Sequence, residues 1–210
     1  MYMKKRKVTT AWEVQVAILS ALAIILYNFP KFQLPFFPGM LSVQFSMLPT
    51  IIGGFALGPV GGIYIVLIKF IFKLLTTRSA GVGEFVDLII GICVVLVTSL
   101  IYKYIKSKKG AIIALIMGSI TWVVVAVILN WLWAIPFYCN TFGMDKVIGM
   151  IMVIPGVNES NYMSKYLLFG CLPFNLMLAS VVSIVTYIIY KRVSWLFEKM
   201  TNKIEKKNRD

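Results

Sequence analysis

The sequence predicts an all-α protein, an integral membrane bundle of six helices with an outward-facing pocket beneath long outer loops. Apolar residues make up 60% of the 210-residue chain, and the mean hydropathy is +0.86. Several apolar runs reach the twenty or so residues that cross a hydrocarbon core about 30 Å thick. Gly-Pro pairs or lysine clusters separate these runs and mark the turns between helices.

Four predicted spans are uninterrupted: 12–29, 81–104, 111–133 and 166–193. The stretch 43–75 would make a helix of about 50 Å at 1.5 Å per residue, too long for one crossing. Because proline lacks an amide donor and restricts the residue before it, we expect Gly58-Pro59 to be a hairpin tip. The hairpin joins a short helix over 46–57 to a longer one over 59–75.

The net charge of +13 indicates topology in so apolar a chain, rather than a nucleic-acid partner. Fifteen of the 21 lysines and arginines fall before the first helix, in 103–109, or after the last helix. An even number of crossings puts all three segments on one side, which the positive-inside rule assigns to the cytoplasm. A signal peptide is the alternative for the basic start Lys4–Lys7, but 27–31 is no small-residue cleavage site.

The predicted outer connections differ from the inner ones. The first, 30–44, is rich in proline and aromatic residues, and the third, 134–164, contains its own apolar segment, 147–154. Long connections in compact domains are commonly functional or disordered, and this one is too apolar for disorder. We interpret it as a lid over the outer mouth, with a passive tether as the alternative. Residues 1–195 form the predicted domain, and 196–210 a basic cytoplasmic tail.

Few polar residues fall within the spans. Glu84 and Asp87 lie three residues apart on one helix face. They either cap the helix dipole near the interface, or at least one of them lines a cavity open to the outside. Because a charge at the bilayer centre is costly, they must lie near the rim, face water, or pair with Arg78, Lys73 or Lys69. Asn130 and Asn175 lie in apolar surroundings, where a buried amide needs a partner on another helix or a ligand. Either interhelical hydrogen bonding or a shared site with Glu84 explains the two amides.

Other signals are weaker or missing. Ala17 and Ala21 give a small-xxx-small stripe on the first helix, which packing within the bundle also explains. The chain has no histidine and no phosphate-binding P-loop motif, so no metal site, cofactor or catalytic residue is expected. Any uphill transport would need energy from a partner.

Several motifs together resemble the substrate-binding S components of energy-coupling-factor (ECF) vitamin transporters, specifically the riboflavin branch. They are Phe36-Phe37-Pro38, the run from Gln44 to Gly62, Leu67-Ile68-Lys69, Thr76-Thr77 with Gly81–Glu84, and Leu172–Asn175. The resemblance implies capture of riboflavin or a related flavin at the prokaryotic plasma membrane, and no enzymatic activity. It implies polar pocket residues at Glu84, Asn130 and Asn175.

The resemblance also implies partners. Ala17 and Ala21 would dock on a membrane coupling subunit, the T component, which joins two ATPases. We further expect Phe45 to form part of the pocket wall beside the flavin ring, and Asp87 to belong to the substrate-binding residues. The flavin is the transported ligand and not a cofactor.

Four positions depart from the family pattern: Gln44, Met47, Phe70 and Leu178. The family commonly has a lysine where this chain has Leu178, and a charged donor there would contribute roughly 1.5–3 kcal/mol if it touched the ligand. A different vitamin is therefore the alternative substrate. A small membrane enzyme and a channel without a capture site are the alternatives from other classes.

Overall fold

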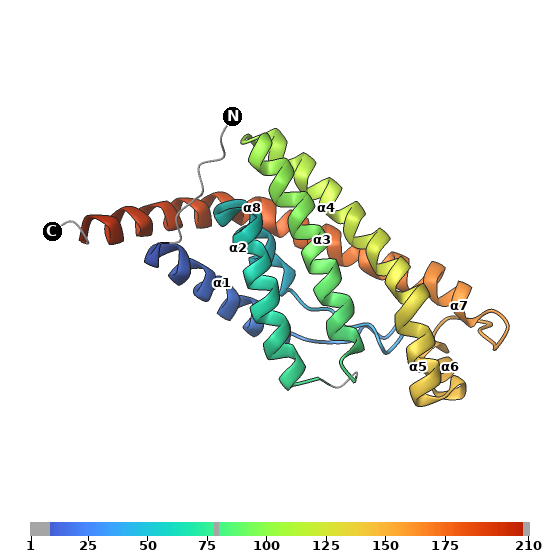
Figure 1. Ribbon diagram of the computed structural model, residues 1–210. Helices are drawn as coiled ribbons and strands as arrows, with labels where there is room; N and C mark the ends of the chain where they lie inside the picture. Colours follow the sequence, from blue (N-terminus) through green and yellow to red (C-terminus); the bar gives the residue numbers. More distant parts are fainter. Residues whose placement is uncertain (1–8, 78–79, 208–210) are drawn as a thin grey trace.

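The computed structural model describes residues 9–77 and 80–207, and these form an all-helical bundle (Figure 1). The basic start Lys4–Lys7, together with Arg78 and Arg209, lies outside the described residues. The first long helices are α1 (Thr10–Asn28), α2 (Met47–Leu75) and α3 (Val82–Tyr104). In the described part of the chain, β-type pairing is limited to an isolated antiparallel bridge between Phe32 and Val43.

The second half of the chain consists of two long, irregular helical columns. One contains α4 (Lys108–Leu129), the π-helix η1 (Asn130–Ala134) and α5 (Ile135–Phe142). The short helix α6 (Met144–Ile151) follows. The other column contains α7 (Tyr162–Lys165), the π-helix η2 (Tyr166–Cys171) and α8 (Leu172–Lys207).

The element α2 consists of two helical arms that form a hairpin at Gly58, as the sequence predicts. Gly58 has φ 83° and ψ 179°, a conformation outside the helical region that glycine adopts without steric cost. A Cβ built on Gly62 would lie 3.1 Å from the Cα of Gly54, whereas eight residues of straight helix span about 12 Å. The two arms are therefore antiparallel. Within the described residues, five long apolar helical segments thus make six packed columns.

The described helix ends that adjoin the lysine clusters in the sequence gather at one end of the bundle. Gln15 of α1 donates hydrogen bonds to the Phe197 carbonyl at 2.8 Å and to Thr201 at 3.0 Å. Phe55, before the hairpin tip, stacks on Tyr102 at the end of α3, with ring centroids 4.4 Å apart. Both rings also contact Tyr190 of α8. The start of α1, the hairpin tip, the end of α3 and the later part of α8 thus lie together.

Two predicted boundaries are wrong. The helix expected to end at Trp133 continues to Phe142, because a π-helical turn accommodates Pro136 without breaking the column. The helix expected over 166–193 continues to Lys207. Much of the segment expected to be a separate tail is therefore helical, and its residue Phe197 is buried.

The outside of the bundle is apolar. Ile116, Ile184 and Ile188 expose 55–66% of their surface, and many other large apolar side chains are also exposed. Such a surface is stable in lipid and costly in water. Inside, α3 packs on α2 and α4, and α8 packs on α2 and α4. Figure 1 shows α8 crossing behind these helices.

Candidate functional site

Asp87 lies at the centre of a charged cluster between α2 and α3. The ammonium groups of Lys69 and Lys73 each lie 2.8 Å from its Oδ2 atom. The Lys69 side chain is fully buried, and Asp87 is 14% exposed. A buried carboxylate must be paired or hydrogen-bonded, and here two cations share one oxygen. Of the alternatives that the sequence left open for Asp87, the structure shows pairing with Lys69 and Lys73.

Gln44 connects this cluster to the end of the first loop. Its side-chain nitrogen donates to Asp87 Oδ1 at 3.2 Å. Its side-chain oxygen accepts from the Ser46 backbone at 3.3 Å, and also from the Ser46 hydroxyl. Lys69 donates to the same hydroxyl at 3.2 Å and lies 3.8 Å from Met47 Sδ. Of these two departures from the family pattern, Met47 contacts the buried Lys69, and Gln44 contacts two of its partners, Asp87 and Ser46.

Glu84 lies one turn before Asp87 on α3 and is buried, with 4% of its surface exposed. Its carboxylate accepts hydrogen bonds from Thr77 at 2.9 Å and from Tyr27 at 3.4 Å. The Tyr27 ring lies beneath the Lys73 ammonium, which is 4.1 Å from the ring centroid. Glu84 and Asp87 therefore belong to one polar region at the end of the bundle opposite the hairpin tip.

Asn130 is the first residue of η1 and is 9% exposed. Its Nδ2 donates to the Ala126 carbonyl at 2.8 Å. Its Oδ1 accepts from the hydroxyl of Tyr166, the first residue of η2, at 2.9 Å. The first residues of the two π-helices are thus hydrogen-bonded to each other, and π-helical turns are frequent at functional sites.

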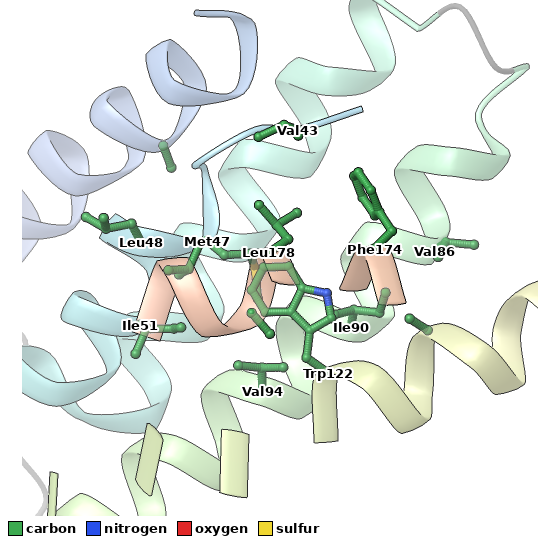
Figure 2. Packing of buried hydrophobic residues seen from close by; sticks show 14 of the residues in the cluster. Val43, Met47, Leu48, Ile51, Val86, Ile90, Val94, Trp122, Phe174 and Leu178 are labelled. Carbon is green, nitrogen blue, oxygen red and sulfur yellow. The ribbon is translucent and has the colours of Figure 1, made fainter. Parts of the chain in front are cut away.

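Asn175 lies on α8 and is 7% exposed. Its Nδ2 donates to the Cys171 carbonyl at 2.8 Å, and its Oδ1 accepts from the Trp122 indole at 3.1 Å. Figure 2 shows the Trp122 ring at the centre of the apolar core, close to Leu178 and Phe174. Leu178 is 4% exposed, so this departure from the family pattern lies in the bundle interior.

The first loop and the segment after α5 contact each other. The Gly39 amide donates to the Met150 carbonyl at 3.1 Å. Phe37 packs edge-on against Phe174, with ring centroids 5.3 Å apart. Val147 and Ile151 of α6 are fully buried, which agrees with the predicted apolar segment. Phe45 is half-buried against the core, and its amide donates to the Leu26 carbonyl.

Ala17 and Ala21 are both exposed on α1, on a side of the helix that the rest of the bundle leaves uncovered. Ser20 and Ala23, beside them in the sequence, are buried and face inward. The alternative that Ala17 and Ala21 are packed inside the bundle is therefore wrong for the described structure.

Sequence reasoning missed Tyr27, Trp122 and Tyr166 as partners of the candidate site residues. An aromatic side chain in an apolar run is ordinarily interpreted as packing or as part of the membrane-interface girdle. A usable signal for the π-helices was the position of the prolines: η1 ends two residues before Pro136, and η2 two residues before Pro173.

The chain matches a family model described as ECF transporter, substrate-specific component, over residues 14–190. The chain belongs to this family. The family is a group of transporter subunits that capture substrate, so this S component is a multi-pass protein of the bacterial plasma membrane and not an enzyme.

Relatives agree with this assignment. Riboflavin transporter RibU of Staphylococcus aureus (strain TCH60) is 31% identical over 194 residues, covering 92% of this chain and 93% of that protein. Riboflavin transporter FmnP of Bacillus subtilis (strain 168) is 29% identical, with 87% and 92% covered. A solved structure, described as "Structure and mechanism of the S component of a bacterial ECF transporter", is 30% identical and covers 88% of this chain and 96% of its own. Its TM-score is 0.68.

Proposed function

We propose that this S component captures riboflavin, or a closely related flavin, from outside the cell. The observation that carries the proposal is the similarity, over nearly the whole chain, to proteins named as riboflavin transporters. The buried amides of Asn130 and Asn175 support it, since small-molecule pockets combine apolar walls with a few orienting polar groups.

The pocket that we propose lies between the polar end of the bundle and the apolar core around Trp122. Phe45 and the core side chains would contact the flat ring system. Asn130 and Asn175 would bond to the ring edge or the ribityl hydroxyls, and Glu84 and Asp87 would border the pocket. The contacts between the first loop and α6 make these segments a suitable lid.

The topology follows from charge. The start of α1, the end of α3 and the later part of α8 lie on one side of the bundle and adjoin the lysine clusters in the sequence, and we assign that side to the cytoplasm by the positive-inside rule. The termini would then be cytoplasmic and the lid external. Ala17 and Ala21 would contact the membrane coupling subunit, whose two ATPase partners would supply energy that no motif of this chain supplies.

A panel of vitamins tests the substrate. The purified protein is mixed in detergent with riboflavin, flavin mononucleotide, thiamine, biotin or folate, and its melting temperature and tryptophan fluorescence are measured. Ligand binding to the folded state raises the melting temperature. We expect the flavins alone to raise it and to quench the fluorescence. A response to a different vitamin, with none to riboflavin, would transfer the proposal to that vitamin.

A further inference from the structure

Two hydrogen bonds of the same kind connect the α4–η1 column to the η2–α8 column. In the first, Asn130 of one column accepts from Tyr166 of the other at 2.9 Å. In the second, Asn175 accepts from Trp122 at 3.1 Å, with the roles of the two columns exchanged. In both, the asparagine Nδ2 donates to the backbone carbonyl four residues earlier, at 2.8 Å.

These partners fix the direction in which each amide points. An indole N–H only donates and a backbone carbonyl only accepts, so Asn175 must turn its oxygen toward Trp122 and its nitrogen toward Cys171. The Ala126 carbonyl likewise requires the nitrogen of Asn130, which leaves its oxygen for the Tyr166 hydroxyl. Loss of the Trp122 indole would remove one of the two groups that select the orientation of Asn175. The Tyr166 hydroxyl can donate or accept, so its loss would take away the partner of the Asn130 oxygen and leave the Ala126 carbonyl alone to hold that amide.

Each amide retains unused hydrogen-bonding capacity after these contacts. A side-chain amide has two N–H donors and two oxygen lone pairs, and the contacts above use one donor and one lone pair. Asn175 Nδ2 also lies 3.5 Å from Cys171 Sγ, a weak acceptor. With 9% and 7% of their surfaces exposed, Asn130 and Asn175 have little water to satisfy the remainder.

We infer that Tyr166 and Trp122 are positioning residues. Tyr166 holds Asn130 and Trp122 holds Asn175, so that each amide presents its remaining N–H and oxygen lone pair to the ligand in a fixed orientation. This inference rests on the proposed function. A flavin carries adjacent N–H and C=O groups on its imide edge, and hydroxyls on its ribityl chain. A ligand with adjacent donors and acceptors is recognised best by amides of fixed orientation, because a wrongly turned amide opposes donor to donor.

Tyr166→Phe is the sharpest test, because it removes one hydroxyl and keeps the ring that packs in the core. We expect the Kd for riboflavin to rise roughly two- to tenfold, the range of one neutral hydrogen bond. Trp122→Phe removes the indole donor from Asn175 and also leaves a space, so its apo melting temperature is measured alongside. Tyr187→Phe, which changes a tyrosine at the other end of the bundle, is the matched control and should leave Kd unchanged.

A double-mutant cycle separates positioning from general support of the fold. In an Asn130→Ala background, Tyr166→Phe should have no further effect on the Kd, because the residue that it positions is gone. In an Asn175→Ala background, the same change should keep its full effect. Equal, additive losses in both backgrounds would overturn the inference. Absence of riboflavin binding by the wild-type protein would instead reject the proposed function.

Discussion

The Lys69 ammonium lies 2.8 Å from Asp87 Oδ2, and Lys73 approaches the same oxygen at 2.8 Å. Because both lysines pair with the same oxygen, substitution of Asp87 should affect stability more than substitution of either lysine. Loss of either lysine leaves the carboxylate with one cation, whereas loss of the carboxylate leaves two buried ammonium groups facing each other.

We therefore predict that Asp87→Asn destabilises the protein by about 3–5 kcal/mol, the cost of breaking a buried ion pair from one side. Lys69→Met should cost less than about 2 kcal/mol, because Lys73 still neutralises Asp87. Denaturant titration in detergent, followed by circular dichroism, measures both. Equal losses for the two variants would contradict the shared-carboxylate arrangement.

Gly62 tests the hairpin in α2. A Cβ at this position would lie 2.5 Å from Val95 Cγ1 and 3.1 Å from the Gly54 backbone. Gly62→Ala should therefore destabilise the protein by about 1–3 kcal/mol through overpacking. Gly149→Ala in α6 is the matched control, since nothing lies within 4 Å of the added methyl group. If Gly62→Ala melted at the same temperature as the wild type, the two arms could not be closely packed at this point.

Leu178→Lys tests the apolar character of the interior beside Trp122. A lysine in the middle of a membrane-spanning helix costs about 3 kcal/mol, so the ligand-free melting temperature should fall. Leu178→Met conserves volume and should cost less than about 1.5 kcal/mol. Thermal unfolding is recorded with and without riboflavin. If the lysine variant melted like the wild type without ligand, Leu178 could not lie in a dry interior.

The exposed alanines test the proposed docking surface. Ala17→Trp should reduce the amount of coupling subunit that co-purifies with this protein, because a bulky ring prevents close approach of another helix. Riboflavin affinity should not change. Ile116→Trp, on an exposed part of α4, is the control for bulk alone. Undiminished co-purification of the Ala17 variant would move the docking surface elsewhere.

The sequence predicted the features that depend on local chemistry. Gly58-Pro59 marked the hairpin because proline lacks an amide donor and restricts the residue before it. Pairing with a lysine was among the alternatives for Asp87, because a carboxylate in apolar surroundings needs a cation. The spacing of Ala17 and Ala21 alone did not predict their exposure, since a small-residue stripe packs equally well inside or outside a bundle; the family resemblance implied it through docking on a partner.

The sequence misled where a tertiary arrangement overrides a local preference. The helix expected to end at Trp133 continues past Pro136, because widening of the preceding turn into η1 lets the column continue. The partners of Asn130 and Asn175 were hidden for a related reason. Tyr166 and Trp122 form part of apolar runs. Their hydrogen bonds to the asparagines form only because the α4–η1 column packs against the η2–α8 column, which is distant in the sequence.

Isothermal titration of riboflavin into the wild-type protein and into the Asn130→Ala, Asn175→Ala double variant tests the central claim most directly. The account predicts saturable binding of one riboflavin per wild-type chain and roughly four- to hundredfold weaker binding by the double variant, since each amide contributes at least one hydrogen bond. Asn28→Ala, which changes an exposed asparagine of α1, should bind like the wild type. Unchanged affinity in a folded double variant would contradict the claim that these two amides hold the ligand.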